Sequence, residues 1–400
     1  MELVDLLDKC RKNNKVFLYG AGKYGKRAKL YLEQNGVEVA AFLQTDVIPG
    51  EKSFRSTPIC GISEVVITED DLVIVCAGMA SREAILLELR KKQVSNIEVM
   101  DRGLYELMCE NSSFGKVMDV PNGRYIQVLL FHRVIGKDDD PWRLEIRPQL
   151  FEQYMSYIAD HYNVARFEDD WSWVKEKTIV VTFDDGYWDN YRYALPILEK
   201  YHVPATIFVS TANLGTGREF WWDRLARLVS EEELVTIRNR LRQMSPAERD
   251  AALDDIEKRA VISREALETD RALNTEELKK LADSEFITIG GHTVNHNALM
   301  YQSLEEQKDE IEVSKQTIER IIGKEITTFS YPFGQRDTYS DETIEILREC
   351  GFQKAASTLP ELAGSDVDPF EVPRIGQPEV PLDVFVKKLE EKWYLEGDKW

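Results

Sequence analysis

The chain has 400 residues, of which 43% are hydrophobic and 10% aromatic, and its formal net charge is −20 at pH 7. This composition is that of a globular protein, and the length predicts more than one domain. The negative charge argues against nucleic acid and anionic membrane surfaces as partners, because both are bound through clustered Lys and Arg, and no apolar run approaches the ~20 residues of a membrane span.

The charge is distributed unevenly along the chain. Residues 1–115 contain 15 Lys/Arg and 17 Asp/Glu, whereas the remainder contains 36 and 54. The five cysteines lack metal-ligand or disulfide spacing, which predicts free thiols in a reducing compartment; they are Cys10, Cys60, Cys76, Cys109 and Cys350. The N-terminal segment has acidic residues and lacks the apolar core of a secretory signal. We therefore expect a cytoplasmic protein.

Residues 15–107 alternate between strand-like and helix-like segments. We expect helices over 23–36 and 81–93 and strands over 15–20, 37–42, 71–78 and 96–100. This order is typical of βαβ units with a parallel sheet. We predict a small Rossmann-like domain of the nucleotide-binding type over residues 1–115.

A glycine-rich turn joins the first expected strand to the first expected helix of this domain. Gly20, Gly22 and Gly25 in "GAGKYG" have the spacing of a dinucleotide-binding turn, with the helix N-terminus facing a phosphate. The acid that would bind a ribose is not evident, because Asp46 lies beyond the end of the second strand, and the domain is short. We expect a nucleotide or nucleotide-sugar here; the alternative is a domain that binds nothing and mediates assembly, for example as a homo-oligomer.

The periodic pattern stops over residues 108–124, which collect Gly, Pro, Asn and Ser. We place the linker at 116–124 and a second domain at 125–400. Strands are expected at 125–134, 178–183, 204–210, 286–291, 327–334, 352–358 and 371–376, and helices at 148–161, 190–202, 304–322, 341–351 and 382–394. Repeated βα units predict a barrel whose loops gather at the carboxyl ends of the strands. Residues 229–284 predict a helical insertion.

Two adjacent carboxylates, Asp184 and Asp185, end the strand over 178–183. Like charges in such a place require a nearby cation. His292 and His296 are four residues apart and follow the strand over 286–291, so their imidazoles can face one metal ion. Two imidazoles and one carboxylate are a common ligand set for a catalytic zinc, and the second aspartate is then free to take a proton from water. A helix-capping turn and two surface histidines are the alternatives.

The motifs together resemble those of the polysaccharide deacetylases, the NodB-homology carbohydrate esterases. "TFDDG" and "HTVNH" match the first two motifs of this family, and the match continues over residues 125–390 with "PATIFV", "SYPFG" and "EVPRI". The resemblance implies a distorted (β/α)7 barrel, a divalent metal ion, most often Zn²⁺, and hydrolysis of the N-acetyl group of an amino sugar.

The same resemblance assigns roles to individual positions. It implies that Asp184 is the general base and that the metal ligands are Asp185, His292 and His296. Residues Tyr331, Pro332 and Phe333 fall on the third motif, where the backbone N–H of the aromatic position, here Phe333, helps to hold the oxyanion.

Two departures from the family pattern are visible. Ser330 occupies the position where the best-known members have an arginine that orients the base, and no histidine follows His296 to act as the acid. "LLFHRV" resembles an early segment of the branch that includes biofilm poly-N-acetylglucosamine deacetylases, so we assign the acid role to His132. Arg374 is our candidate for the missing arginine. A structural histidine and a surface ion pair are the respective alternatives.

Three tryptophans, Trp188, Trp221 and Trp222, are candidates for stacking on sugar rings, with core packing as the alternative. We expect a metal-dependent carbohydrate N-deacetylase that acts on a nucleotide- or lipid-linked precursor, or an oligosaccharide, in surface-glycan synthesis. The departures from the family pattern leave two alternatives. One is a catalytically idle protein that binds glycan or nucleotide, and the other is a hydrolase of another N-acyl group, such as N-formyl.

Overall fold

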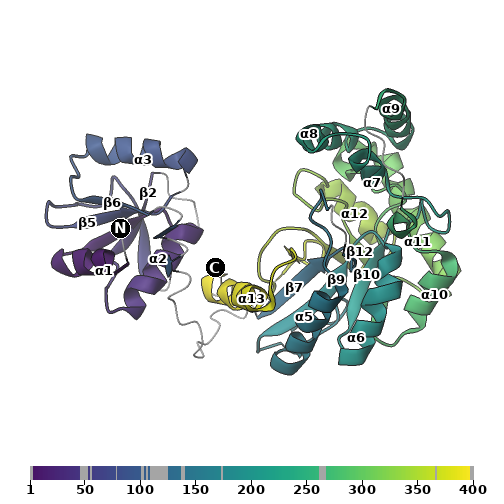
Figure 1. Cartoon of the computed structure of the whole chain (residues 1–400), viewed down its shortest axis with the longest axis horizontal. Helices are drawn as coiled ribbons and strands as arrows, with labels where there is room; N and C mark the ends of the chain where they lie inside the picture. Colours follow the sequence, from purple (N-terminus) through teal and green to yellow (C-terminus); the bar gives the residue numbers. More distant parts are fainter. Residues whose placement is uncertain are drawn as a thin grey trace. The chain divides into compact units, whose positions relative to one another are not determined.

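The computed structural model describes residues 3–45, 53–54, 56–77, 79–100, 103–104, 107–108, 125–136, 140–172, 174–260, 267–364 and 367–396. The chain divides into two compact units, Met1–Asn122 with Glu390–Trp400, and Gly123–Leu389 (Figure 1). The predicted linker at 116–124 and Asp46 lie outside the described residues. Of the helices in the described ranges, none combines the length and apolar character needed to traverse a bilayer.

A six-stranded sheet forms the centre of the first unit. Its order is β3-β4-β2-β1-β5-β6, and all neighbours are parallel except β3 and β4. The strands are β1 Val16–Tyr19, β2 Ala41–Gln44, β3 Ser53–Phe54, β4 Thr57–Gly61, β5 Leu72–Val75 and β6 Ile97–Val99. The strands expected from the sequence form, although β2 begins four residues later than predicted, and the sequence pattern missed β3 and β4.

Helices cover both faces of this sheet because the side chains of a strand alternate between its faces. Val16 and Leu18 of β1 pack with helices α1 Leu3–Lys12 and α2 Lys23–Gln34, whereas Phe17 and Tyr19 pack with helix α3 Met79–Lys91. Buried strand residues on both faces explain why these segments are nearly continuous apolar runs. The sequence pattern did not predict α1.

The glycine-rich turn between β1 and α2 has a steric reason for two of its glycines. Gly20 has φ of 111°, and a Cβ on Gly25 would lie 1.8 Å from the carbonyl oxygen of Gly20. The helix can therefore approach the strand this closely only without a side chain at Gly25. A Cβ on Gly22, which precedes α2, would meet no atom within 4 Å.

The second unit contains an all-parallel sheet with the order β13-β12-β11-β10-β9-β7-β14, with β8 paired to β9. Its strands are β7 Ile126–Phe131, β8 Asn163–Val164, β9 Thr178–Phe183, β10 Ala205–Val209, β11 Ile287–Gly291, β12 Thr328–Ser330, β13 Lys354–Ala356 and β14 Ile375–Gly376. An isolated parallel bridge joins Ala356, at the end of β13, to Val372, which lies three residues before β14. The sheet therefore curls into a barrel-like α/β fold, as the sequence predicted.

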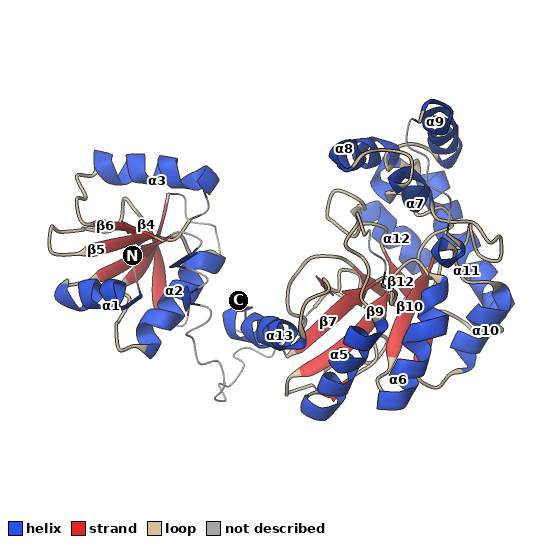
Figure 2. Ribbon diagram, in the orientation of Figure 1, coloured by secondary structure: helices blue, strands red, loops and turns tan. Residues whose placement is uncertain are grey.

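Helices surround this curled sheet (Figure 2). They are α5 Pro148–His161, the π-helical turn Asn190–Ala194 that continues into α6 Leu195–Tyr201, α7 Trp221–Ala226, α8 Glu231–Leu241, α9 Pro246–Arg259, α10 Thr275–Asp283, α11 Leu304–Ile322, α12 Asp341–Glu349 and α13 Leu382–Glu396. The predicted capping box of α11 is present, because Ser303 accepts a hydrogen bond from the Glu306 N–H and Glu306 accepts one from Ser303.

The expected helical insertion over 229–284 requires a correction at both ends. Helices α7, α8 and α9 gather at one end of the unit (Figure 1), and they share an apolar cluster that includes Trp222, Leu234 and Leu253. Helix α10 instead packs against β11 and α11, so it belongs to the ring of helices around the barrel. The insertion therefore begins before residue 229, with α7, and ends before α10.

Candidate metal centre and active site

Three side chains that leave the carboxyl ends of two strands converge on one point. Asp185 follows β9, and His292 and His296 follow β11. Asp185 Oδ1 lies 3.4 Å from Nε2 of His292 and 3.4 Å from Nε2 of His296. One ligand atom from each residue lies within 4.8 Å of the other two, which is the spacing of a site that could hold a metal ion.

The state of these three groups fits a divalent cation. Asp185 Oδ1 is buried and accepts no hydrogen bond, which is costly for a carboxylate oxygen unless a cation binds it. His292 Nδ1 lies 2.7 Å from the Ser330 carbonyl oxygen. Nδ1 therefore carries the proton, and the Nε2 lone pair points toward Asp185, as in histidine ligands of zinc. Burial lowers the pKa of His296 to about 3, so its imidazole is neutral and can also act as a ligand.

Backbone strain concentrates around this point. Among the described non-glycine residues, eight have positive φ, and four of them belong to the site: Asp185, Thr293, His296 and Phe333. Asp185 has φ of 76° and lies at the centre of a three-residue turn in which the Gly186 N–H donates to the Asp184 carbonyl, 3.0 Å away. Such conformations cost about 1–3 kcal/mol each and persist where the surrounding structure enforces them, as at ligand-binding sites.

The other aspartate, Asp184, is paired with Arg374. Arg374 Nη1 donates to Asp184 Oδ1 and Nη2 to Oδ2, both at 2.7 Å. Arg374 is fully buried, and its Nη2 also lies 2.7 Å from the Ser330 hydroxyl, which in turn donates to Asp184 Oδ2 at 3.2 Å. Burial acts to raise the pKa of Asp184, but the Arg374 guanidinium outweighs it and holds that pKa well below its usual value. The structure thus brings together Asp184, Arg374 and Ser330.

His132 lies at the mouth of the same site. It follows β7, is partly exposed, and lines a cavity of about 230 Å³ together with Asp184, Asp185, His292 and His296. Burial lowers the pKa of His132 below its usual value, and the carboxylates of Asp185 and Asp184 oppose this only in part. Its imidazole is therefore neutral at pH 7 and faces the site.

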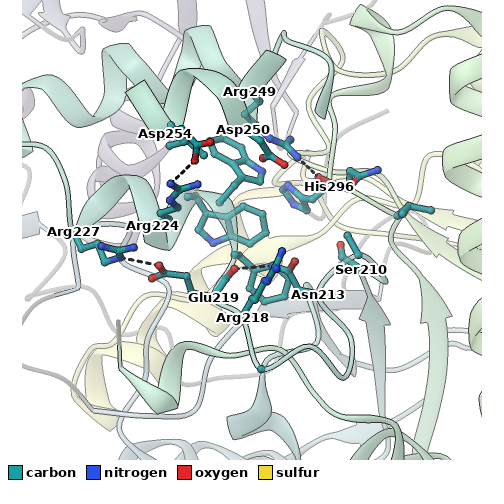
Figure 3. Close-up of a pocket in the computed structure, with 18 residues that line it drawn as sticks. Ser210, Asn213, Arg218, Glu219, Arg224, Arg227, Arg249, Asp250, Asp254 and His296 are labelled. Atoms are coloured by element: carbon teal, nitrogen blue, oxygen red, sulfur yellow. Dashed lines mark hydrogen bonds and ion pairs between the residues drawn. The ribbon is translucent and has the colours of Figure 1, made fainter. Parts of the chain in front are cut away.

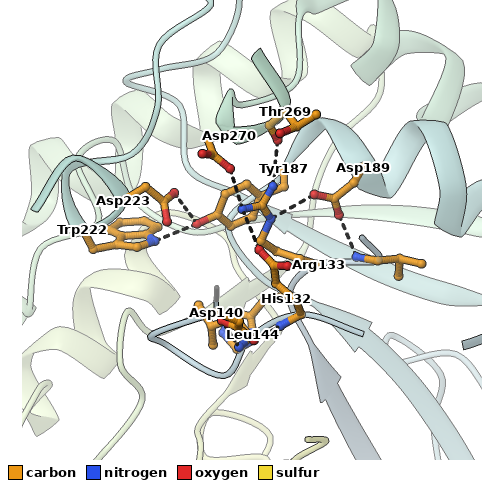
Figure 4. A network of polar contacts seen from close by, with 12 residues as sticks. His132, Arg133, Asp140, Leu144, Tyr187, Asp189, Trp222, Asp223, Thr269 and Asp270 are labelled. Carbon is orange, nitrogen blue, oxygen red and sulfur yellow. Dashed lines mark hydrogen bonds and ion pairs between the residues drawn. The ribbon is translucent and has the colours of Figure 1, made fainter. Parts of the chain in front are cut away.

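A network of ion pairs behind His132 fixes the chain at this point (Figure 4). Arg133 Nε donates to Asp189 at 3.0 Å, and Arg133 Nη1 to Asp270 at 2.9 Å. Asp189 also accepts the Val134 N–H at 2.8 Å, and the Asn190 amide donates to the His132 carbonyl at 2.8 Å. No motif in the sequence marks these positioning residues, although Arg133 stands directly beside His132.

The third motif contributes one aromatic ring to the site. The Phe333 ring lies 4.9 Å from that of His296 and lines the cavity, and Phe333 has φ of 63°. Tyr331 is buried with its hydroxyl donating to the Phe370 carbonyl at 2.9 Å, so its side chain serves the core, and neither Tyr331 nor Pro332 is among the residues that line the cavity. Of the three residues on this motif, Phe333 is therefore the one whose side chain lines the cavity.

The tryptophans expected to stack on sugar rings differ in position. Trp222 lines the cavity, with its ring 4.4 Å from that of His296 and its Nε1 donating to the Tyr187 hydroxyl at 2.7 Å. Trp188 does not line it; Arg271 lies over its ring, 5.4 Å from the centroid. The expected contact of Trp188 with a substrate in this cavity therefore has no support among the lining residues.

A second, larger cavity of about 770 Å³ shares Trp221, Trp222 and His296 with the first (Figure 3). Its wall contains ion pairs of Arg224 with Asp254 and of Arg227 with Glu219. This polar depression lies next to the three candidate metal ligands and has room for a bound group.

The sequence profile of the polysaccharide deacetylase family matches residues 173–355. These residues are therefore similar to the polysaccharide deacetylases. The matched segment contains Asp184, Asp185, His292, His296 and the third motif, whereas His132 and Arg374 lie outside it. The deacetylase resemblance inferred from the motifs is thereby confirmed.

Several known proteins resemble the chain. YxkH of Bacillus subtilis, provisionally named a polysaccharide deacetylase, is 23% identical over 257 residues, which is 62% of this chain and 70% of that protein. The deacetylase PplD of Streptococcus pyogenes, solved with acetate, is 19% identical with a TM-score of 0.47 and covers 67% of this chain and 99% of that one. IcaB of Ammonifex degensii is 18% identical with a TM-score of 0.47, and the match covers 69% of this chain and 98% of that one.

Two charged residues that no sequence motif marks hold the loop that carries His296. Glu310 of α11 accepts the N–H groups of Val294 and Asn295 at 2.9 and 2.8 Å. Arg249 of α9 donates to the Asn295 carbonyl at 3.1 Å and to the Asn297 side chain at 2.8 Å. Both act on the backbone beside His296. Glu310 could have been noticed as an acid on the apolar face of its helix, next to Ile311.

Proposed function

We propose that the Gly123–Leu389 unit hydrolyses the N-acetyl group of an amino sugar with the help of a divalent metal ion, Zn²⁺, held by Asp185, His292 and His296. The observation that carries this proposal is the buried Asp185 Oδ1, equidistant from two imidazole nitrogens and without a hydrogen-bond donor. Together with the family resemblance it favours an enzyme over an idle binding protein. When bound, the ion acidifies water and polarises the acetyl carbonyl.

In this proposal Asp184 accepts the proton of the attacking water. Its lowered pKa keeps it ionised at any working pH. Its Oδ1 retains a lone pair beside the one that Arg374 occupies, whereas Oδ2 accepts from both Arg374 and Ser330. A low pKa also makes Asp184 a weak base, and the reaction therefore depends on a water that is more acidic than bulk water. Arg374 acts as a positioning residue because it fixes the plane of the carboxylate.

His132 protonates the leaving amine in the same scheme. Because its imidazole is neutral in the free protein, it must take up a proton after the substrate binds, and that proton is the one that Asp184 has accepted from the attacking water. The N–H of Phe333 is the donor to the oxyanion that forms when water attacks the acetyl carbonyl. Trp222 contributes an apolar face to the cavity for the sugar.

The substrate that we propose is a nucleotide- or lipid-linked precursor, or an oligosaccharide, of surface-glycan synthesis in the cytoplasm. We further propose that the first unit is a Rossmann-like domain that binds a nucleotide or nucleotide-sugar at Gly20, Gly22 and Gly25. The parallel strand order β4-β2-β1-β5-β6, with the glycine turn directly after β1, supports this.

The function is tested by metal content and acetate release. The purified chain is expected to bind about one zinc ion, and to release acetate from N-acetylhexosamine conjugates, whereas the chelator-treated protein should lose this activity and regain it with Zn²⁺ or Co²⁺. Release of formate instead of acetate, measured in parallel, would identify a different acyl group. Absence of tightly bound metal together with absence of any acyl release would overturn the proposal.

Replacing Glu310 with Ala should weaken metal binding about 10- to 100-fold, because it removes the carboxylate that holds the backbone beside His296. Glu305→Ala, an exposed acid on the same helix, is the matched control and should leave the zinc affinity unchanged. Competition with a chromophoric chelator measures the zinc affinity of both variants. Equal affinities for the two variants would show that Glu310 does not position the ligand loop.

Replacing His132 with Gln should lower kcat by about 100-fold or more, because general acid catalysis contributes roughly that much. The zinc content and the KM should stay near those of the wild type, since His132 is not a metal ligand in our assignment. His161→Gln, a histidine at the exposed end of α5, is the control. A substrate with a better leaving group should recover part of the loss; a loss of metal instead would indicate a ligand role.

A further inference from the structure

The cavity that contains the metal-binding residues has one feature that the proposed hydrolysis does not use. Thirteen residues line it, and Arg238 is the one Lys or Arg among them. Arg238 belongs to α8, so it comes from the inserted helices and not from the strand ends that carry the catalytic groups. Its guanidinium lies over the rings of Trp142 and Phe333, 5.7 and 5.5 Å from their centroids.

Arg238 has no acidic partner within the part of the chain that the structure describes. Its Nε is buried and meets no hydrogen-bond acceptor. Burial lowers the pKa of Arg238, and the charged neighbour that acts on it is a second cation, Arg242. The two aromatic rings attract a cation, but they leave the N–H groups of the guanidinium without acceptors. A partly buried cation in this state is poorly compensated.

The surrounding arginines show that acids are available in this region. Arg224 pairs with Asp254 at 2.7 Å, Arg227 with Glu219 at 2.7 Å and Arg242 with Asp337 at 3.1 Å. The whole chain has 71 acidic residues against 51 basic ones. The lack of a partner for Arg238 is therefore a local property of the cavity wall and not a result of too few carboxylates.

The position of Arg238 relative to the metal ligands suits a substituent of the reacting sugar. Arg238 lies 5.5 Å from the Phe333 ring centroid, and that ring lies 4.9 Å from the ring of His296. The distance from the Arg238 guanidinium carbon to the centre of the His296 ring therefore cannot exceed the sum of these two distances. A single hexosamine unit can place its N-acetyl group at the metal ligands and a neighbouring anionic group at Arg238.

We propose that Arg238 binds an anionic group of the substrate, a phosphate or a carboxylate on or next to the N-acetylated sugar. This inference rests on the proposed deacetylase function and narrows its substrate class to anionic amino sugars. The planar guanidinium donates two parallel hydrogen bonds to either group, and such bonds form best in a partly desolvated cavity. An anion from the substrate supplies the acceptors that the protein itself withholds.

The test compares matched substrates on the full chain. N-acetylglucosamine 1-phosphate supplies a phosphate, an N-acetylhexosaminuronic acid supplies a carboxylate, and methyl N-acetylglucosaminide is the neutral counterpart. The ratio of kcat/KM for the anionic over the neutral substrate is expected to fall about 10- to 100-fold in Arg238→Gln, the range expected for one charged hydrogen-bonded pair. The ratio for Arg238→Lys should lie between those of the wild type and Arg238→Gln, because lysine keeps the positive charge but cannot donate two parallel hydrogen bonds.

Arg240→Gln is the control, because Arg240 is exposed on the same helix and the substitution removes the same charge. It should leave the ratio unchanged. The phosphate and uronate substrates distinguish the two kinds of anion. The group that Arg238 binds is the one whose kcat/KM ratio over the neutral substrate falls in Arg238→Gln. An equal loss for anionic and neutral substrates, or no preference in the wild type, would overturn the proposal.

A binding experiment separates this proposal from the proposed function. Calorimetry measures the affinity of glucosamine 1-phosphate and of methyl glucosaminide for the wild type and for Arg238→Gln. Both proteins are treated with chelator, so that neither hydrolysis nor a bound metal contributes. The phosphate compound should bind the wild type at least about 10-fold more tightly than it binds Arg238→Gln. If no acetate is released but this difference in affinity is found, the anion-binding proposal holds and the deacetylase proposal is wrong. If acetate is released but the two affinities are equal, the deacetylase proposal holds and the anion-binding proposal is wrong.

Discussion

Asp184→Asn is expected to lower kcat/KM for deacetylation by about 100- to 10,000-fold, because the amide cannot accept the proton of the attacking water. Zinc content should remain near that of the wild type, since Asp185 and not Asp184 belongs to the three-residue ligand cluster. Acetate release and metal analysis on the same preparation measure both quantities. Wild-type activity in this variant would remove Asp184 from the reaction.

The stability of Asp184→Asn must be separated from its chemistry, because the substitution leaves the buried Arg374 without its counter-ion. The double variant Asp184→Asn with Arg374→Met removes both charges and should recover much of the lost stability, as neutral replacements of buried pairs often do. It should not recover activity. Asp160→Asn, at an exposed position of α5, is the control for the charge change alone.

Arg374→Met is expected to lower the free energy of unfolding by about 3–5 kcal/mol, because it leaves Asp184 as a buried charge without a partner. Arg336→Met removes an arginine that pairs with Glu371 at the surface and should cost less than about 1 kcal/mol. Urea unfolding of both variants gives the comparison. Equal losses would show that the Arg374 pair contributes no more than a surface ion pair.

The same pair predicts a dependence on pH. Arg374 lowers the pKa of Asp184 in the folded protein, so the unfolded chain, where aspartate titrates near about 3.9, binds this proton more tightly. The stabilisation is therefore fully present above about pH 5 and is lost as the pH falls through the lower folded value. The difference in unfolding free energy between the wild type and Arg374→Met should shrink on acidification.

We expect an arginine at position 330 to be able to replace Arg374 as the partner of Asp184. The Ser330 hydroxyl lies 2.7 Å from Arg374 Nη2 and 3.2 Å from Asp184 Oδ2, and Ser330 stands where the third motif of the best-known family members has arginine. The double variant Ser330→Arg with Arg374→Ser should therefore regain part of the stability and activity that Arg374→Ser loses. Failure to recover either would show that the two positions cannot exchange this role.

The motifs and the elements that carry them could be predicted from the sequence because each depends on neighbouring residues. Asp184 and Asp185 are adjacent, and His292 and His296 are four residues apart, so one strand end or one turn holds each pair. The helix over 304–322 begins at a capping box that spans only four residues. Short strands such as β3 and β4 were missed, because two to five residues show too little periodicity.

The partners of these motifs were decided by the tertiary structure. Arg374 meets Asp184 across 190 positions of sequence because β14 lies beside β7, which in turn pairs with β9. Arg133 meets Asp270 across 137 positions because the segment after β7 packs against the segment before α10. The direction of a side chain at a turn depends on backbone angles that residue types do not fix. The sequence therefore did not show that Trp188 would be missing from the residues that line the cavity.

The sequence by itself determined the chemical groups of the site, the strand ends that present them and the family that they resemble. Only the tertiary structure decided which cation neutralises Asp184, which acid supports the loop of His296, and that Arg238 faces the cavity without a partner. The physical reason is that electrostatic compensation of a buried charge depends on distance in space, and residues far apart in the chain supply it once the barrel closes.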